Sequence, residues 1–325
     1  MKIIDNVGSL NYINQRLERR FLPQFEDVES LEDFWKDEFG QENKILRRNR
    51  YLLEFELSEL KIRLPQNELE RNSLNILKER SAIKMGTIKW LFLKIKLSWK
   101  IYRIDRKILR DKNRKNDLEN SFDRALAKSS KKEISSVKGI RRVLNESRTF
   151  VLGAIGEQKL VEALNSLSDE FTLVNDVNLE FQKSLYRRKY KDYIKTVQID
   201  HVLVGPSGVF VIETKNWSRQ NWQSSQGSSP YYQLERANYA MYRWLGMGKR
   251  VPIRGLLVST GYKPTFKMDF IKVLHPTEIA PYVNYFGTVL NHRETQRLIS
   301  RFTNKGFWNW IGFSFLKIAP AGAFC

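Results

Sequence analysis

The chain has 325 residues, of which 42% are hydrophobic and 12% aromatic, so its composition predicts two folded domains and excludes a mainly disordered protein. Its 56 lysines and arginines outnumber the 36 acidic residues, and the formal net charge of +20 favours a polyanionic partner, either nucleic acid or an anionic lipid surface. A single cysteine, Cys325, and three scattered histidines exclude a disulfide framework and a cysteine–histidine zinc cluster, and they fit a cytoplasmic protein.

Residues 1–147 are predicted to form a helical, basic N-terminal arm for binding or oligomerisation. Apolar residues recur at helical spacing from Leu31 to Leu64, and Pro65 is expected to end that helix. The stretch from Asn67 to Ala127 contains no proline and predicts a long helix or a coiled coil, through which two copies of the chain could form a homodimer.

Positive charge is concentrated between Lys84 and Lys115, where twelve basic residues are opposed by two acids, Asp105 and Asp111. A solvated helix face, a nucleic-acid-contacting arm and a basic helix lying on a membrane surface all remain open for this stretch. We do not expect a membrane-spanning helix. Ile83–Ile104 is interrupted by lysines, and the apolar C-terminal tail, Phe307–Phe324, contains a proline and two glycines.

Residues 148–325 are predicted to form a second domain, of the α/β class. The expected elements, in chain order, are helix Thr149–Leu167, strand Phe171–Phe181, strand Thr196–Val204, strand Val209–Ile212, helix Pro230–Leu245 and strand Gly255–Ser259. This order of helix, three strands, helix and strand describes helices packed around a mixed sheet.

The most informative segment is a predicted hairpin around the turn Gly205-Pro206-Ser207-Gly208, in which proline suits the second position and glycine the fourth. If the hairpin closes tightly there, Asp200 lies opposite Glu213. Because side chains alternate along a strand, Lys215 shares the face of Glu213. Two carboxylates and an ammonium group are therefore expected to converge on one patch of the sheet.

Two facing carboxylates repel each other, so this patch needs a compensating positive charge. Lys215 supplies part of it, and a hard divalent cation with oxygen ligands supplies more: Mg²⁺, for which Mn²⁺ can substitute. Such a cation polarises a phosphodiester and activates water for in-line attack on phosphorus, while Lys215 stabilises the developing charge. The alternative is that Asp200 and Glu213 are ordinary strand-end residues satisfied by local partners.

The segment Ile199–Trp217 resembles the nuclease-related domain, NERD, of the PD-(D/E)xK nuclease superfamily. Upstream, Gly153-Ala154-Ile155-Gly156-Glu157 resembles that family's Gly-x-x-Gly-Glu helix. The resemblance covers about Thr149 to Asn291 and implies a restriction-endonuclease-like αβββαβ core with a mixed sheet. In one respect the chain departs from the superfamily pattern, because Ile199 precedes Asp200 where the namesake motif has a proline.

The resemblance also implies roles for individual residues. Asp200 and Glu213 match the two metal-binding carboxylates. Glu157 matches the acid on the first helix, which would approach the metal or its water, so the predicted metal-binding residues are Asp200, Glu213 and Glu157. Lys215 matches the superfamily's lysine, and Gln233 matches a glutamine near the active site. These five residues form the predicted catalytic set.

A basic stretch, Lys183–Lys195, directly precedes the strand that carries Asp200, and it contains three tyrosines. It could follow a phosphate backbone and stack bases, or it could be a solvated hairpin tip. The predicted nucleic-acid contacts are Lys183, Arg187, Arg188, Lys189 and Lys191.

Taken together, these features predict a Mg²⁺-dependent nuclease that hydrolyses phosphodiester bonds in nucleic acid. DNA and an endonuclease activity are favoured, the latter by analogy with the superfamily, and defence or DNA processing is the expected setting. The alternatives are a catalytically idle nucleic-acid-binding module and a membrane-surface scaffold. No Gly-x-x-x-x-Gly-Lys-Ser/Thr motif occurs, so any translocation would require an ATPase or helicase partner.

Overall fold

The computed structural model describes residues 1–37, 39–81, 87–217, 230–246, 251–263 and 271–303. The chain divides into two compact units, one formed by Met1–Trp35 with Arg142–Cys325 and the other by Lys36–Arg141.

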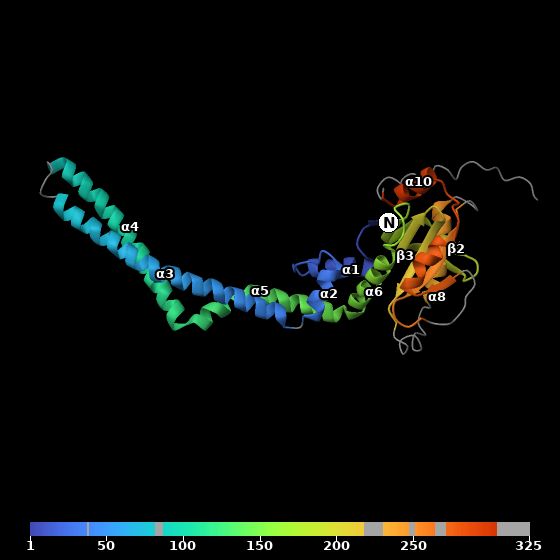
Figure 1. Cartoon of the computed structure of the whole chain (residues 1–325), viewed down its shortest axis with the longest axis horizontal. Coiled ribbons are helices and arrows are strands. Elements are labelled where there is room, and N and C mark those ends of the chain that lie inside the picture. Colours follow the sequence, from blue (N-terminus) through green and yellow to red (C-terminus); the bar gives the residue numbers. More distant parts are fainter. Residues whose placement is uncertain (38, 82–86, 218–229, 247–250, 264–270, 304–325) are drawn as a thin grey trace, which may run out of the picture. The chain divides into compact units, whose positions relative to one another are not determined.

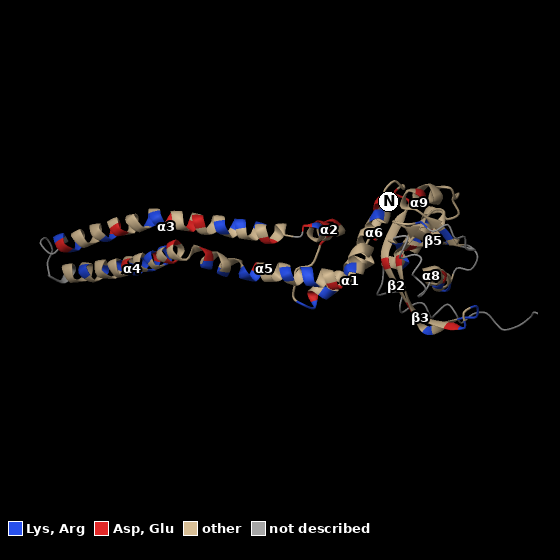
Figure 2. Cartoon of the chain, turned by 90° about the horizontal axis from the view of Figure 1, so that it is seen from below, with Lys and Arg blue, Asp and Glu red and all other residues tan. Residues whose placement is uncertain are grey.

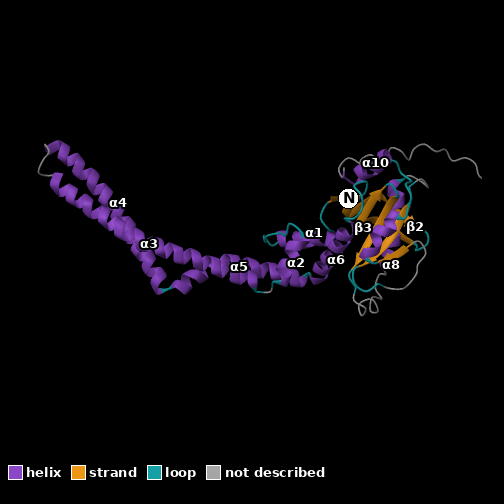
Figure 3. Ribbon diagram, in the orientation of Figure 1, coloured by secondary structure: helices purple, strands orange, loops and turns teal. Residues whose placement is uncertain are grey.

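The first unit is built on a six-stranded mixed sheet (Figures 1 and 3). Its strands are β1 (Lys2–Ile4), β2 (Thr172–Arg187), β3 (Asp192–Gly205), β4 (Gly208–Lys215), β5 (Ile253–Ser259) and β6 (Ile271–Leu274). The strands β2, β3 and β4 are antiparallel neighbours. At one edge β1 pairs with β2 in parallel, and at the other edge β5 pairs with β4, and β6 with β5, also in parallel. Spatial order therefore follows chain order.

The helices of this unit are α1 (Gly8–Glu18), α2 (Val28–Lys36), α6 (Arg148–Leu164), α8 (Pro230–Leu245), α9 (Pro276–Asn284) and α10 (His292–Thr303). One face of the β3–β4 hairpin, with Val202, Val204 and Val211, packs with α8 and α10 in a single apolar core. The alternate residues Leu203 and Phe210 are also fully buried, on the face near α6 and α9. Burial on both faces explains why these strands are almost continuously apolar.

The predicted order of one helix, three strands, a helix and a strand is confirmed by α6, β2, β3, β4, α8 and β5. The boundary between the units differs from the expected division at residue 147, because residues 1–35 fold with the sheet. Lys2 to Ile4 pair with Thr172 to Val174, and α1 packs against α6. A three-residue strand whose partner lies about 170 residues away leaves no periodic signal in the sequence.

The second unit consists of α3 (Gly40–Ser81), α4 (Thr87–Asn120) and the larger part of α5 (Phe122–Glu146). Helices α3 and α4 lie side by side and antiparallel (Figure 1). Two small apolar clusters join the helices of this unit, one made of Leu64, Leu74, Ile104 and Ile108, the other of Leu53, Leu60, Leu118 and Leu126. The apolar faces of these helices therefore pack against helices of the same chain.

The expectation that Pro65 ends the helix is wrong, because α3 continues through it to Ser81. A proline inside a helix removes one backbone hydrogen bond. The apolar contacts with α4 continue on both sides of it, at Leu64 and Leu74, and packing of this kind offsets the loss. The stretch Asn67–Ala127 is not one helix, since α3, α4 and α5 divide it.

Three cations of the basic stretch Lys84–Lys115 pair with acids on α3, and its two acids pair with arginines of α3. Both signs of charge run along these helices in Figure 2. The ion pairs between the two helices are Arg114–Glu56, Arg63–Asp111, Lys112–Glu68, Arg71–Asp105 and Lys100–Glu70. Their side chains are mostly half-exposed, so each pair contributes at most about 1 kcal/mol. The pairs fix the alignment of the helices more than they stabilise the unit.

No helix within the described residues is long and apolar enough to cross a membrane. The apolar tail Phe307–Phe324 and Cys325 lie outside the described residues, so the expectation for the tail is not tested.

We expect Leu118→Ala to lower the free energy of unfolding of the helical unit by about 2–5 kcal/mol, because it leaves a cavity at a fully buried position. Leu109→Ala is the matched control, since Leu109 lies on the same helix and is 61% exposed. Urea unfolding followed by helical circular dichroism would measure both variants. Equal losses would contradict the predicted packing of α3 on α4.

Candidate active site

Four charged side chains from three elements line one cleft of about 790 Å³ in the first unit. Glu157 comes from α6, Asp200 from β3, and Glu213 and Lys215 from β4. Gln233 of α8 lines the same cleft. The structure thus brings together all five residues of the predicted catalytic set.

The β3–β4 turn places Asp200 beside Glu213. The strands pair from Gly205 with Gly208 out to His201 with Ile212, which is the register predicted from the turn. One residue further, the Asp200 carboxylate Oδ2 accepts a hydrogen bond of 2.9 Å from the backbone N–H of Thr214. This bond fixes the carboxyl group of Asp200 against β4, next to Glu213.

Lys215 lies on the same strand face as Glu213, as alternation requires, and its Nζ donates to Glu213 Oε1 at 2.5 Å. Glu213 is 6% exposed, whereas the Lys215 side chain is 29% exposed at the cleft. The ammonium group is therefore held by the carboxylate on one side and remains accessible on the other.

Glu157 is held by a residue that sequence reasoning missed. Ser9 of α1 donates its hydroxyl to Glu157 Oε1 at 2.5 Å, and its backbone N–H lies 3.4 Å from Oε2. The two residues are 148 positions apart, and no pattern near residue 9 pointed to a site. The N-terminal segment therefore completes the cleft.

The two glycines of the Gly153-x-x-Gly156-Glu157 motif let other segments approach α6 closely. A Cβ atom at Gly153 would lie 2.8 Å from Ser9 Oγ. At Gly156 it would lie 3.1 Å from Thr260 Oγ1 and 3.2 Å from Asn216 Cβ. The motif thus has a steric reason: the first glycine admits the serine that binds Glu157, and the second admits the segment that follows β4.

Burial and mutual repulsion raise the pKa values of the acids. Burial, and then the charge of Asp200, raise the pKa of Glu157 to about 8, against the hydrogen bonds from Ser9. The same two causes raise the pKa of Glu213 to about 7, although Lys215 opposes them. Burial also raises the pKa of Asp200. Near neutral pH the cleft therefore retains protons on its acids, because its own lysine does not fully compensate the charge that they would carry when ionised.

The pKa of Lys215 is set by opposing effects. Burial alone would lower it, but the carboxylates of Glu213 and Asp200 outweigh burial, and its pKa is raised. Lys215 is consequently a stable cation at neutral pH and not a proton acceptor. It can hold a negatively charged oxygen in place.

The acidic side chains of the cleft offer carboxylate oxygens as ligands, and no thiol is present among the described residues. Oxygen ligands suit a hard divalent cation. Within the described part of the chain, Asp200 Oδ1 and Glu213 Oε2 accept no hydrogen bond from the protein. No three acidic, histidine or cysteine side chains of the described residues are grouped closely enough to enclose a metal. The arrangement fits Mg²⁺, which typically takes one or two carboxylates and keeps several waters.

Two further residues of α8 face the cleft. Gln233 is exposed, and Arg236, one turn later, also lines the cleft and donates to the carbonyl of Thr196 at 3.3 Å. Arg236 was missed because a lone arginine on a helix carries no motif. It is the cation of α8 best placed to meet a phosphate in the cleft.

His201 is not part of the site. It is fully buried, its Nδ1 lies 2.7 Å from Asn175 Oδ1, and burial lowers its pKa to about 3. It lies on the face of β3 opposite Asp200.

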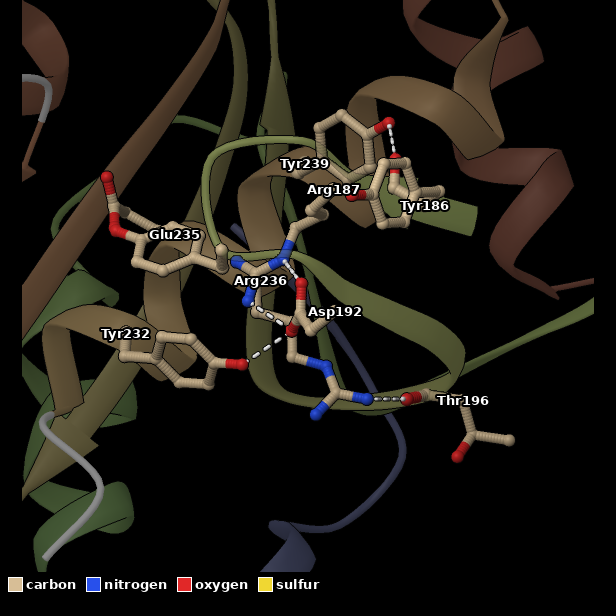
Figure 4. Close-up of polar contacts among 9 residues, drawn as sticks. Tyr186, Arg187, Asp192, Thr196, Tyr232, Glu235, Arg236 and Tyr239 are labelled. Carbon is tan, nitrogen blue, oxygen red and sulfur yellow. Dashed lines mark hydrogen bonds and ion pairs between the residues drawn. The ribbon is translucent and has the colours of Figure 1, made fainter. Parts of the chain in front are cut away.

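The predicted nucleic-acid contacts lie near the tip of the β2–β3 hairpin, and they differ in exposure and in their partners. Lys183, Arg188 and Lys191 are exposed, whereas Lys189 pairs with Glu235 at 2.7 Å. Arg187 is 4% exposed and makes two hydrogen bonds to Asp192, of 2.9 and 2.7 Å (Figure 4). Arg187 therefore holds the hairpin together and is not available to a phosphate.

Comparison with known proteins agrees with this geometry. Residues 152–260 match the family model of the nuclease-related domain, NERD, about a third of the chain. The matched segment contains Glu157, Asp200, Glu213 and Lys215, as well as Gln233. Searches of the curated proteins and of the solved structures gave no significant match.

The raised acid pKa values predict that the metal-free protein loses stability as the pH rises. Glu157 and Glu213 keep their protons in the folded state up to about pH 8 and pH 7, whereas the unfolded chain releases them near its ordinary pKa of 4.5. The contribution is therefore present below pH 4.5 and is lost between about pH 5 and 8, on the order of a few kcal/mol. Mg²⁺ should stabilise the protein more at pH 8 than at pH 5.5.

Thermal unfolding in EDTA and in Mg²⁺ at several pH values would measure this effect. The double variant Glu157→Gln/Glu213→Gln is the control, and its stability should depend less steeply on pH. An equally steep dependence in both proteins would sink the prediction.

The steric role of Gly153 predicts coupling between Gly153 and Ser9. In a helix interior, replacing glycine by alanine ordinarily stabilises by about 1 kcal/mol. Because the new methyl group meets Ser9 Oγ, we expect Gly153→Ala to give no gain in the wild-type background, and to give it when Ser9 is alanine. Urea unfolding of the four proteins of this double-mutant cycle measures the coupling, and additive effects would contradict the close approach.

Proposed function

We propose that this protein is a divalent-metal-dependent nuclease that hydrolyses phosphodiester bonds in nucleic acid, with DNA as the favoured substrate and internal cleavage as the favoured mode. The observation that carries the proposal is the convergence of Glu157, Asp200, Glu213 and Lys215 in one cleft. An ordinary pair of strand-end acids would be satisfied locally and would keep ordinary pKa values. Here two of the acids have pKa values of about 7 and 8.

Each residue of the cleft has a distinct part in this proposal. Asp200 and Glu213 would hold Mg²⁺ through the oxygens that accept no hydrogen bond from the described residues, and the bound ion would supply Lewis-acid activation of the phosphodiester. Lys215 donates a hydrogen bond to Glu213, and its raised pKa keeps it positively charged. It would stabilise the negative charge that develops on the phosphoryl oxygens. Glu157, oriented by Ser9, would approach the metal or its water, and a bound cation would favour its ionised form.

The cations around the cleft would orient the nucleic-acid backbone. Arg236 faces the cleft from α8, and Gln233 lies one turn before it. At the hairpin tip, we retain Lys183, Arg188 and Lys191 as phosphate contacts, because they are exposed. Lys189 is half of an ion pair, and Arg187 is excluded by its burial.

The nuclease proposal is tested by incubating the full-length protein with supercoiled plasmid and linear duplex in Mg²⁺ or Mn²⁺. We expect nicked and linear products with wild-type protein, no products in EDTA, and a loss of at least about 100-fold in rate for Asp200→Asn, Glu213→Gln and Lys215→Ala. Single-stranded DNA and RNA in the same assay would establish the substrate class.

Two matched controls separate loss of chemistry from loss of folding. Glu162→Gln and Lys159→Ala alter exposed residues of α6 and should cleave as wild type does. If the wild-type protein binds DNA but cleaves none of these substrates in either metal, the nuclease proposal fails and a nucleic-acid-binding module takes its place.

A further inference from the structure

The β2–β3 hairpin displays two tyrosines side by side near its tip. Tyr186 and Tyr193 are directly paired across the strands, with ring centroids 5.0 Å apart and an angle of 44° between the rings. They are 47% and 67% exposed. The pair therefore offers aromatic faces to solvent at a place where no core requires them.

The surroundings of this pair are strongly positive. Between residues 181 and 195 the sequence has six basic residues and one acid, Asp192. That acid is fully engaged, because Arg187 and then Tyr232 hydrogen-bond it, and they lower its pKa to about 2. Lys183, Arg188, Lys191 and Lys195 are exposed around the tyrosines. Exposed aromatic faces among unneutralised cations suit an anionic ligand that contains rings.

The hairpin that carries the platform is attached to α8, and Figure 4 shows Tyr186 and Arg187 of the hairpin beside Tyr232 and Tyr239 of that helix. The guanidinium of Arg187 lies between the rings of Tyr190 and Tyr232, 4.5 and 4.6 Å from their centroids. From α8, the Tyr239 hydroxyl donates to the carbonyl of Tyr186 at 3.0 Å. These contacts fix the backbone beneath the tyrosines, so a ligand that stacks there does not have to order a loose hairpin.

The same strand leads from the platform to the catalytic cleft. Thr196, the first residue of β3 that lines the cleft, follows Tyr193 by three positions, or about 10 Å of strand. Helix α8, which anchors the hairpin, also carries Gln233 and Arg236 into the cleft. The hairpin that carries the platform and the catalytic cleft therefore share β3 and α8.

We propose that Tyr186 and Tyr193 form a stacking platform for unpaired bases, so that this protein binds single-stranded nucleic acid, or a single-stranded flank of a duplex, in preference to a fully paired duplex. The physical reason is that base faces are available for stacking only when they are not stacked on each other within a helix. The placement of the platform beside a nuclease site rests on the proposed function, whereas the binding itself does not require cleavage.

The test measures binding of full-length protein to fluorescent oligonucleotides by anisotropy in EDTA, where no cleavage occurs. The probes are a single strand, its duplex, and the same strand with abasic sites. We expect Tyr186→Leu/Tyr193→Leu to weaken single-strand binding about 10- to 100-fold with an unchanged salt dependence, and to leave binding to the duplex and the abasic strand nearly unchanged. The conservative variant Tyr186→Phe/Tyr193→Phe keeps both rings and should bind as wild type does.

Two control variants give the test its meaning. Tyr285→Leu removes a tyrosine that is 82% exposed elsewhere and should have no effect. Lys183→Gln/Arg188→Gln should weaken binding to all three probes and reduce the slope of log affinity against log salt by about 1 to 2. A solvated hairpin tip would leave single-strand binding unchanged in the leucine variant, and that result would overturn the platform.

Failure of the platform and failure of the nuclease give different results. If the wild-type protein cleaves nucleic acid but Tyr186→Leu/Tyr193→Leu binds a single strand as tightly as wild type, only the platform is overturned. Tyrosine-dependent binding by a protein that never cleaves overturns the nuclease alone.

Discussion

The tight turn between β3 and β4 is the constraint on which the site depends. Strand pairing from Gly205–Gly208 to His201–Ile212 determines which side chains share a face, and a slip of one residue would send Asp200 and Glu213 to opposite sides. Gly208 has a φ of +119°, and a Cβ atom there would lie 2.6 Å from the carbonyl oxygen of Pro252. The conformation and the space at this position both require glycine. The same residue closes the hairpin and lets β5 approach.

Once the turn is closed, the site is under electrostatic strain that the chain alone does not relieve. Burial and the charge of Asp200 hold protons on Glu157 and Glu213 above pH 6, and one lysine offsets only part of the repulsion. Loss of those protons would leave negative charge that the lysine does not balance, and a cation bound there would offset it. The cost to stability and the capacity for metal binding therefore have one cause. Such conflicts between stability and local preference are expected at functional sites.

How much of this could be predicted depends on how local each signal is. The hairpin, the limits of α8 and the convergence of Asp200, Glu213 and Lys215 follow from short-range patterns: turn residues, alternation and an acid–x–lysine triplet. Glu157 was assigned only through the resemblance of its helix motif to the NERD family. The contribution of Ser9 could not be foreseen, because its partner Glu157 lies 148 residues away and a serine near a helix start is common. The continuation of α3 through Pro65 was missed for a related reason, since packing on α4 outweighs a local preference.

The basic stretch in the β2–β3 hairpin marks a further limit of sequence reasoning, because charge alone does not assign a role to a cation. Arg187 and Arg188 are neighbours of the same type, yet one is buried against Asp192 and two tyrosines while the other is exposed. Arg187 is the last residue of β2 and faces α8, whereas Arg188 is the first residue of the turn that follows. One face of the hairpin is used to attach it to α8 and the other is left to solvent. A surface that is to bind a flexible polyanion needs both: cations and rings that are free, and a framework that keeps them in place.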